Sequence, residues 1–113
     1  MVDYETILRS EFDGETDSFL VQLRTKLHWD KVAFDRLTRA METCASTQET
    51  HAAIPRWIAE GFWYLDTHTQ DWISHPSFQK IHGDEYYSSA LARLRDLSYW
   101  LFVGERPGNV HGA

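Results

Sequence analysis

Apolar residues recur at helical spacing along most of this chain, and the pattern predicts its secondary structure. Between the turn-forming residues, no run of four or more positions alternates between apolar and polar as a half-buried strand does. We therefore predict an all-α fold: an antiparallel up-down helical bundle of three main helices plus a short N-terminal helix. The predicted main helices span residues 17–45, 50–73 and 84–103, between a short N-terminal segment at 1–15 and a frayed tail at 104–113.

The region 17–45 carries an apolar heptad seam that contains one carboxylate. Its steps of four and three residues join Leu23, Leu27, Phe34, Leu37, Met41 and Cys44, with Asp30 in the remaining slot. Because the phase is preserved across Asp30, we predict one long helix of about 43 Å. The alternative is that Asp30 is the N-cap of a second helix, which would bring both helices nearer the usual length. Cys44 closes the seam, so we expect its thiol to be buried and unreactive.

The other helices have recognisable ends and one unusual interior residue. Asp3 is placed to cap the N-terminal helix, and Pro55 fits the first turn of helix 50–73. Gly83 or Asp84 begins the last helix and Gly104 ends it. Gly61 lies in mid-helix, where glycine costs about 1 kcal/mol relative to alanine, so we expect a neighbouring helix to approach closely there.

Composition and charge narrow the class of protein. The 113 residues carry a net charge of −6, the wrong sign for holding nucleic acid by its phosphates. Residues 1–30 hold seven acidic and three basic residues, so −4 of that charge is local. No apolar stretch approaches a membrane span, and the N-terminus has no signal-peptide pattern. A single cysteine excludes an internal disulfide, so we expect one cytoplasmic domain over residues 1–113 that binds neither nucleic acid nor membrane.

Two polar residues fall on predicted apolar faces and form a candidate pair. If helices 17–45 and 50–73 make an antiparallel hairpin, Asp30 and His68 lie at the same level, so we expect them to hydrogen-bond. Such a pair either fixes the helix register or, with Tyr64 and Trp57, lines an aromatic pocket. No nucleophile is aimed at the pair, so we assign no catalytic residue.

Trp63 is the strongest departure from the helical pattern. It projects from the polar side of helix 50–73. Its neighbours on that side include Arg56, Thr67 and Gln70, and we predict that these four residues form an interface with a protein partner or a second copy. The alternatives are that the N-terminal segment folds over Trp63 and buries it, or that the ring is exposed without a role.

Function is only weakly indicated by the residues. The chain has no nucleotide-binding or metal-binding motif, so we expect no cofactor and no metal. We predict a small acidic protein that acts by binding another protein, of the immunity, antitoxin or inhibitor type, and that is not an enzyme. The alternative is a small-molecule-binding or enzymatic bundle with an aromatic pocket around His68.

Overall fold

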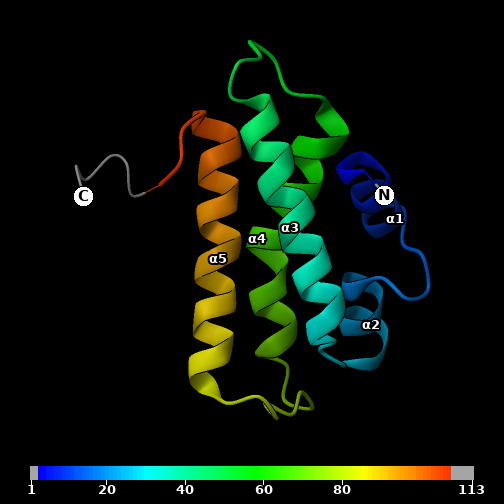
Figure 1. The fold of residues 1–113 in the computed structure, drawn as a ribbon. Coiled ribbons are helices and arrows are strands. Elements are labelled where there is room, and N and C mark those ends of the chain that lie inside the picture. The colour runs from blue at the N-terminus through cyan, green and yellow to red at the C-terminus, as the bar shows by residue number, and fades with distance from the viewer. Residues whose placement is uncertain (1–2, 108–113) are drawn as a thin grey trace.

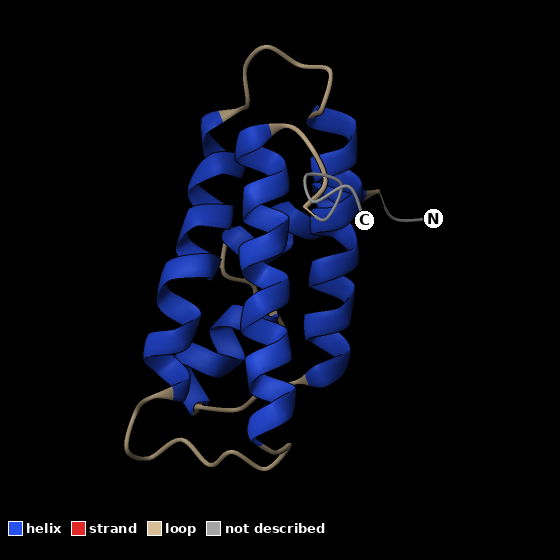
Figure 2. Ribbon diagram, turned by 90° about the vertical axis from the view of Figure 1, so that its left-hand side faces the viewer, coloured by secondary structure: helices blue, strands red, loops and turns tan. Residues whose placement is uncertain are grey.

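A computed structural model describes residues 3–107 of the chain and shows an all-helical bundle (Figure 1). Five helices follow one another: α1 (Tyr4–Phe12), α2 (Phe19–Lys26), α3 (Lys31–Gln48), α4 (Arg56–Ile73) and α5 (Asp84–Val103). The described residues contain no strand. The three long helices run up, down and up, which confirms the predicted antiparallel bundle (Figures 1 and 2). Within residues 3–107, no helix combines the length and the apolar character needed to cross a membrane.

The bundle resembles a four-helix bundle in which the two short helices α1 and α2 together take the place of one long helix. Helices α3 and α4 both pack on α5, while α1 packs chiefly on α3 and α2 contacts α3 and α4 (Figure 1). The pair α1 and α2 therefore covers the side of the bundle opposite α5. The core between the helices consists of apolar side chains that are almost completely shielded from solvent, among them Leu8, Phe19, Leu37, Met41, Phe62, Leu65 and Leu94.

The prediction of one helix over residues 17–45 is wrong, and the alternative is confirmed. Helix α2 ends at Lys26, because its C-cap Leu27 has a left-handed φ of 51° and cannot continue a right-handed helix. Helix α3 then begins after Asp30, whose carboxylate accepts a hydrogen bond from the backbone N–H of Ala33 at 3.1 Å. The heptad phase is the same on both sides of this break. A preserved phase is therefore compatible with two helices and does not show that the helix is continuous.

Burial of Trp29 accounts for the break between α2 and α3. Its side chain is 2% exposed, and its ring lies 4.7 Å from that of Phe19 and 5.0 Å from that of Phe34, measured between centroids. The indole N–H donates to the Tyr86 hydroxyl of α5 at 2.9 Å. Burying a tryptophan with a satisfied N–H offsets the cost of a left-handed leucine, which is about 1–2 kcal/mol.

Three further boundaries differ from the prediction: α2 begins at Phe19 rather than at residue 17, α3 continues to Gln48 rather than ending at 45, and α4 starts later than residue 50. That helix begins at Arg56 with Pro55 as its N-cap, so the predicted start at residue 50 is wrong. Proline disfavours the helical conformation in the residue before it, which explains why residues 50–55 form a connection. Asp3 caps α1 through the N–H of Thr6, and Gly104 ends α5 with φ +89°. Of the predicted frayed tail, residues 104–107 follow the helix and residues 108–113 lie outside the described part.

The carboxylate of Glu11 is buried and joins α1 to α2. Its side chain is 5% exposed and accepts hydrogen bonds from the backbone N–H groups of Phe19 at 3.0 Å and Leu20 at 2.6 Å. These N–H groups belong to the first turn of α2, where no intrahelical acceptor exists. Burial raises the pKa of the Glu11 carboxyl above its ordinary value, although the two N–H groups favour the charged form.

Candidate functional site

The outer face of α4 carries the four residues that the sequence placed at an interface. Arg56, Trp63, Thr67 and Gln70 are all exposed to solvent. Trp63 has 52% of its surface exposed, which is unusual for a side chain of this size. Their role in binding stays a prediction, whereas their position on an open helical face is a structural fact.

The alternative that the N-terminal segment covers Trp63 is wrong, and Gly61 explains why. A Cβ added to Gly61 would lie well under 3.0 Å from ring atoms of Phe12 in α1, so the absence of a side chain admits that ring. This confirms the close approach predicted at Gly61. Since residues two apart differ by about 200° around a helix, a segment docked on Gly61 leaves Trp63 open.

Helix α4 itself carries three carboxylates, those of Glu60, Asp66 and Asp71, against one arginine. Glu60 and Asp71 are exposed, and the carboxylate of Asp66 is 4.0 Å from the guanidinium of Arg95 in α5. Arg56 is the basic residue in the same helix. The acidic excess of α4 complements a basic surface, although Arg9 and Arg24 of the neighbouring helices also lie beside Trp63.

A second feature, the aromatic groove, lies beside this face. It is a hollow of about 240 Å³ between α1, α2 and α4. Its lining comprises aromatic and apolar groups together with charged residues at the rim: Arg9, Phe12, Asp13, Leu20, Arg24, Trp57, Glu60, Gly61, Trp63 and Tyr64. Trp57 and Tyr64, which the sequence assigned to an aromatic pocket, are both half-buried and both line this groove.

The rings in the groove are held by contacts between α1 and α4. Phe12 meets Trp57 edge to face, with 6.2 Å between ring centroids. The guanidinium carbon of Arg9 lies 3.9 Å from the centroid of the Trp57 ring, a cation–π contact that fixes the arginine over one wall. The sequence did not point to Arg9 or Phe12, because their place beside Trp57 depends on how α1 docks.

The predicted Asp30–His68 pair is wrong. Asp30 accepts hydrogen bonds from Ala33 and from the side chain of Gln22, and these bonds lower its pKa. His68 lies 3.2 Å from Asp71 in its own helix and packs against Tyr64 at 4.6 Å between ring centroids. The break before α3 turned Asp30 into a helix cap, so it has partners of its own.

Cys44 is buried as predicted. Its side chain has no exposed surface, and burial raises the pKa of the thiol to about 12. The thiolate that reacts with electrophiles is therefore scarce at neutral pH. Its lack of reactivity stays a prediction that labelling can test.

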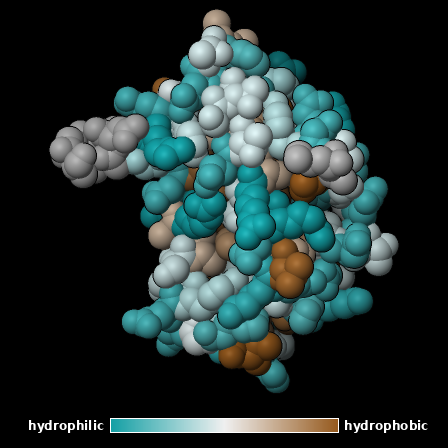
Figure 3. All heavy atoms as spheres, viewed as in Figure 1, coloured by the Kyte–Doolittle hydropathy of each residue, from teal (hydrophilic) through white to brown (hydrophobic). Residues whose placement is uncertain are grey.

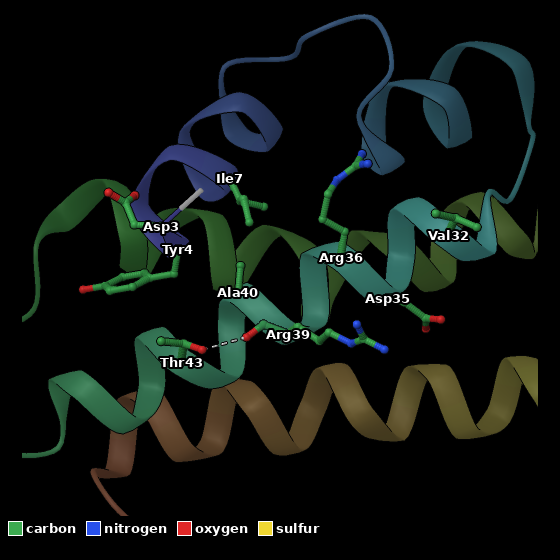
Figure 4. Close-up of a pocket in the computed structure, with 9 residues that line it drawn as sticks. All are labelled: Asp3, Tyr4, Ile7, Val32, Asp35, Arg36, Arg39, Ala40 and Thr43. Carbon is green, nitrogen blue, oxygen red and sulfur yellow. Dashed lines mark hydrogen bonds between the residues drawn. The ribbon is translucent and has the colours of Figure 1, made fainter. Parts of the chain in front are cut away.

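A larger hollow lies between α1 and α3 and is less suited to hold a ligand. Its volume is about 630 Å³, and Figure 4 shows its nine lining residues. Arg36 and Arg39 leave α3 in different directions, so their guanidinium groups do not converge on one point (Figure 4). Asp3 and Asp35 also line the hollow and balance their charge. On the same side of the molecule, apolar residues appear as separate small areas rather than one patch (Figure 3).

No family model, curated protein or solved structure matches this chain.

Proposed function

We propose that the protein acts by binding another protein, with Trp63 as the anchor of the interface and a basic surface as its partner. The observation that carries the proposal is the 52% exposure of Trp63 on the outer face of α4. Tryptophan dominates many interfaces because it buries a large area at little cost in conformational entropy.

Charge favours a basic partner over a second copy. A two-fold dimer through this face would bring together two copies of α4 that each carry three carboxylates, Glu60, Asp66 and Asp71, against one arginine. A basic partner would instead be attracted by the same carboxylates and by the net charge of −6. Small acidic proteins of the immunity, antitoxin or inhibitor type neutralise basic partners in this way, and we assign the chain to this functional class.

Affinity capture followed by calorimetry tests the proposal. The tagged protein and its Trp63→Ala variant are used to capture proteins from a lysate of the cells whose genome encodes this protein. Any protein that the wild type retains is purified and titrated against both. A central aromatic anchor contributes about 2 kcal/mol or more to the free energy of binding. Trp63→Ala should therefore raise the dissociation constant at least about 30-fold. The association rate should also fall as salt is added.

Val32→Ala is the matched control. Val32 is 73% exposed but belongs to α3 and lines the hollow on the α1 side, away from α4. This variant should bind like the wild type, and both variants should keep the wild-type melting temperature within a few degrees. The proposal is refuted if the captured protein binds Trp63→Ala as tightly as the wild type. It is equally refuted if the wild type retains no protein that the variant loses, or if it sediments as a dimer through Trp63.

A further inference from the structure

We propose that the aromatic groove binds a small, flat aromatic molecule that carries one carboxylate. The groove depends on Arg9, Arg24 and Trp57, none of which belongs to the outer face of α4. The inference therefore goes beyond the protein-binding proposal. The groove shares Trp63 and Glu60 with that face, so the two proposals are distinguished by their variants: Trp63→Ala tests the interface and Arg24→Gln tests the groove.

The walls of the groove select a flat aromatic group. Phe12 and Trp57 form one side of the groove, and Trp63 and Tyr64 of α4 line it next to them. Aromatic rings prefer offset-stacked or edge-to-face neighbours, so a planar guest gains contacts that a branched aliphatic molecule of equal size would not. The volume of about 240 Å³ lies below the usual 300–1,000 Å³ of ligand pockets, which limits the guest to one or two rings.

The rim of the groove selects a carboxylate. Arg9 and Arg24 both line the hollow, and within residues 3–107 neither has a carboxylate oxygen within 4.0 Å. Each guanidinium therefore keeps N–H donors for a ligand, and its planar fork matches a carboxylate in two parallel hydrogen bonds. The Trp57 ring under Arg9 holds that guanidinium in place before a ligand arrives, which reduces the ordering cost of binding.

Two acidic residues set the charge that the groove accepts. Asp13 and Glu60 also line the hollow, so its formal charge with the two arginines is balanced. One carboxylate can reach the arginines, whereas a second negative charge on the ligand would face Asp13 or Glu60. The groove therefore favours a monoanion over a dianion or a phosphate.

Titration with 2-naphthoate and its neutral amide, 2-naphthamide, tests the inference. Two-dimensional NMR follows the indole N–H signals and the arginine Nε–H signals of the full chain. The carboxylate should shift the signals of Trp57 and Arg9 in a saturable manner, and the amide should bind at least about 10-fold more weakly, because hydrogen bonds to charged groups contribute about 1.5–3 kcal/mol.

Arginine variants separate the groove from general charge effects. Arg24→Gln should weaken 2-naphthoate binding at least about 10-fold, and Arg24→Lys should recover only part of it because lysine lacks the planar fork. Arg39→Gln removes an equal charge from the α1–α3 hollow and should leave binding unchanged. The inference is overturned if the shifts do not saturate, if the amide binds equally, or if Arg39→Gln causes the same loss. Melting temperatures confirm that each variant is folded.

Discussion

Gly61 offers a direct test of how α1 is attached to the bundle. Replacing Gly61 by alanine should strengthen α4 by about 1 kcal/mol through helix propensity alone. The added Cβ would overlap the Phe12 ring, which lies well under 3.0 Å away and is confined by Trp57. Overpacking of this kind costs about 1–3 kcal/mol, so the net change in the free energy of unfolding should run from about zero to a loss of about 2 kcal/mol.

The decisive quantity is the coupling between the two positions, measured in a double-mutant cycle by urea unfolding. In a Phe12→Ala background the overlap is gone, so Gly61→Ala should stabilise the protein by up to about 1 kcal/mol. The coupling energy should therefore be about 1–3 kcal/mol, with Gly61→Ala more favourable when Phe12 is absent. If Gly61→Ala has the same effect in both backgrounds, Phe12 does not pack on Gly61 and the proposed docking of α1 is incorrect.

Three further predictions concern buried or capping groups. Because the raised pKa of the Cys44 thiol and its burial suppress the thiolate, a thiol reagent should label the native protein no faster than it unfolds; labelling within seconds in native buffer would contradict this. Asp30→Ala should lower the free energy of unfolding by about 1 kcal/mol, because a helix cap is lost. In thermal unfolding its effect should add to that of His68→Leu; a non-additive double mutant would instead indicate that the two side chains interact. Because burial raises the pKa of the Glu11 carboxyl, the folded state favours its protonated form; this stability is fully present below the unfolded-state pKa and is lost as the pH rises through the folded-state pKa. The difference in unfolding free energy, wild type minus Glu11→Gln, should therefore decrease as the pH rises above 4.5, and a constant or increasing difference would refute the assignment.

The sequence predicted a helix correctly where its capping residues and its apolar spacing indicated the same bounds. Helix α5 has acidic residues in its first turn and a glycine at each end, and its predicted bounds of 84–103 are those observed. The break at Leu27 could not be predicted from pattern, since left-handed backbone is normally signalled by glycine or asparagine. The N-cap signal of Asp30 was present in the sequence, but the unbroken heptad phase favoured the wrong alternative.

The candidate site was predictable only where it depends on a single helix. The helical phase within α4 placed Trp63 on the polar side of that helix, but only the structure shows that the N-terminal segment does not cover it. The groove requires α1, α2 and α4 together, and nothing in the chain indicates that Phe12 would settle on Gly61 with Arg9 over Trp57. Glu11 is a further example, because the backbone N–H groups that donate to its carboxylate belong to residues eight and nine positions later, across a turn.

The position of Trp29 also has a consequence for the order in which the chain folds during synthesis. Its hydrogen-bond acceptor, Tyr86, lies 57 residues further along the chain, in the last helix to be made. At a synthesis rate of about 5–20 residues per second, Trp29 waits roughly 3–11 s before Tyr86 has even been added. During that interval α2 and the start of α3 have no α5 to close the aromatic cluster around Trp29. The nascent chain therefore has no partner for the Trp29 indole N–H, and the cluster around Trp29 stays open, until α5 has been synthesised.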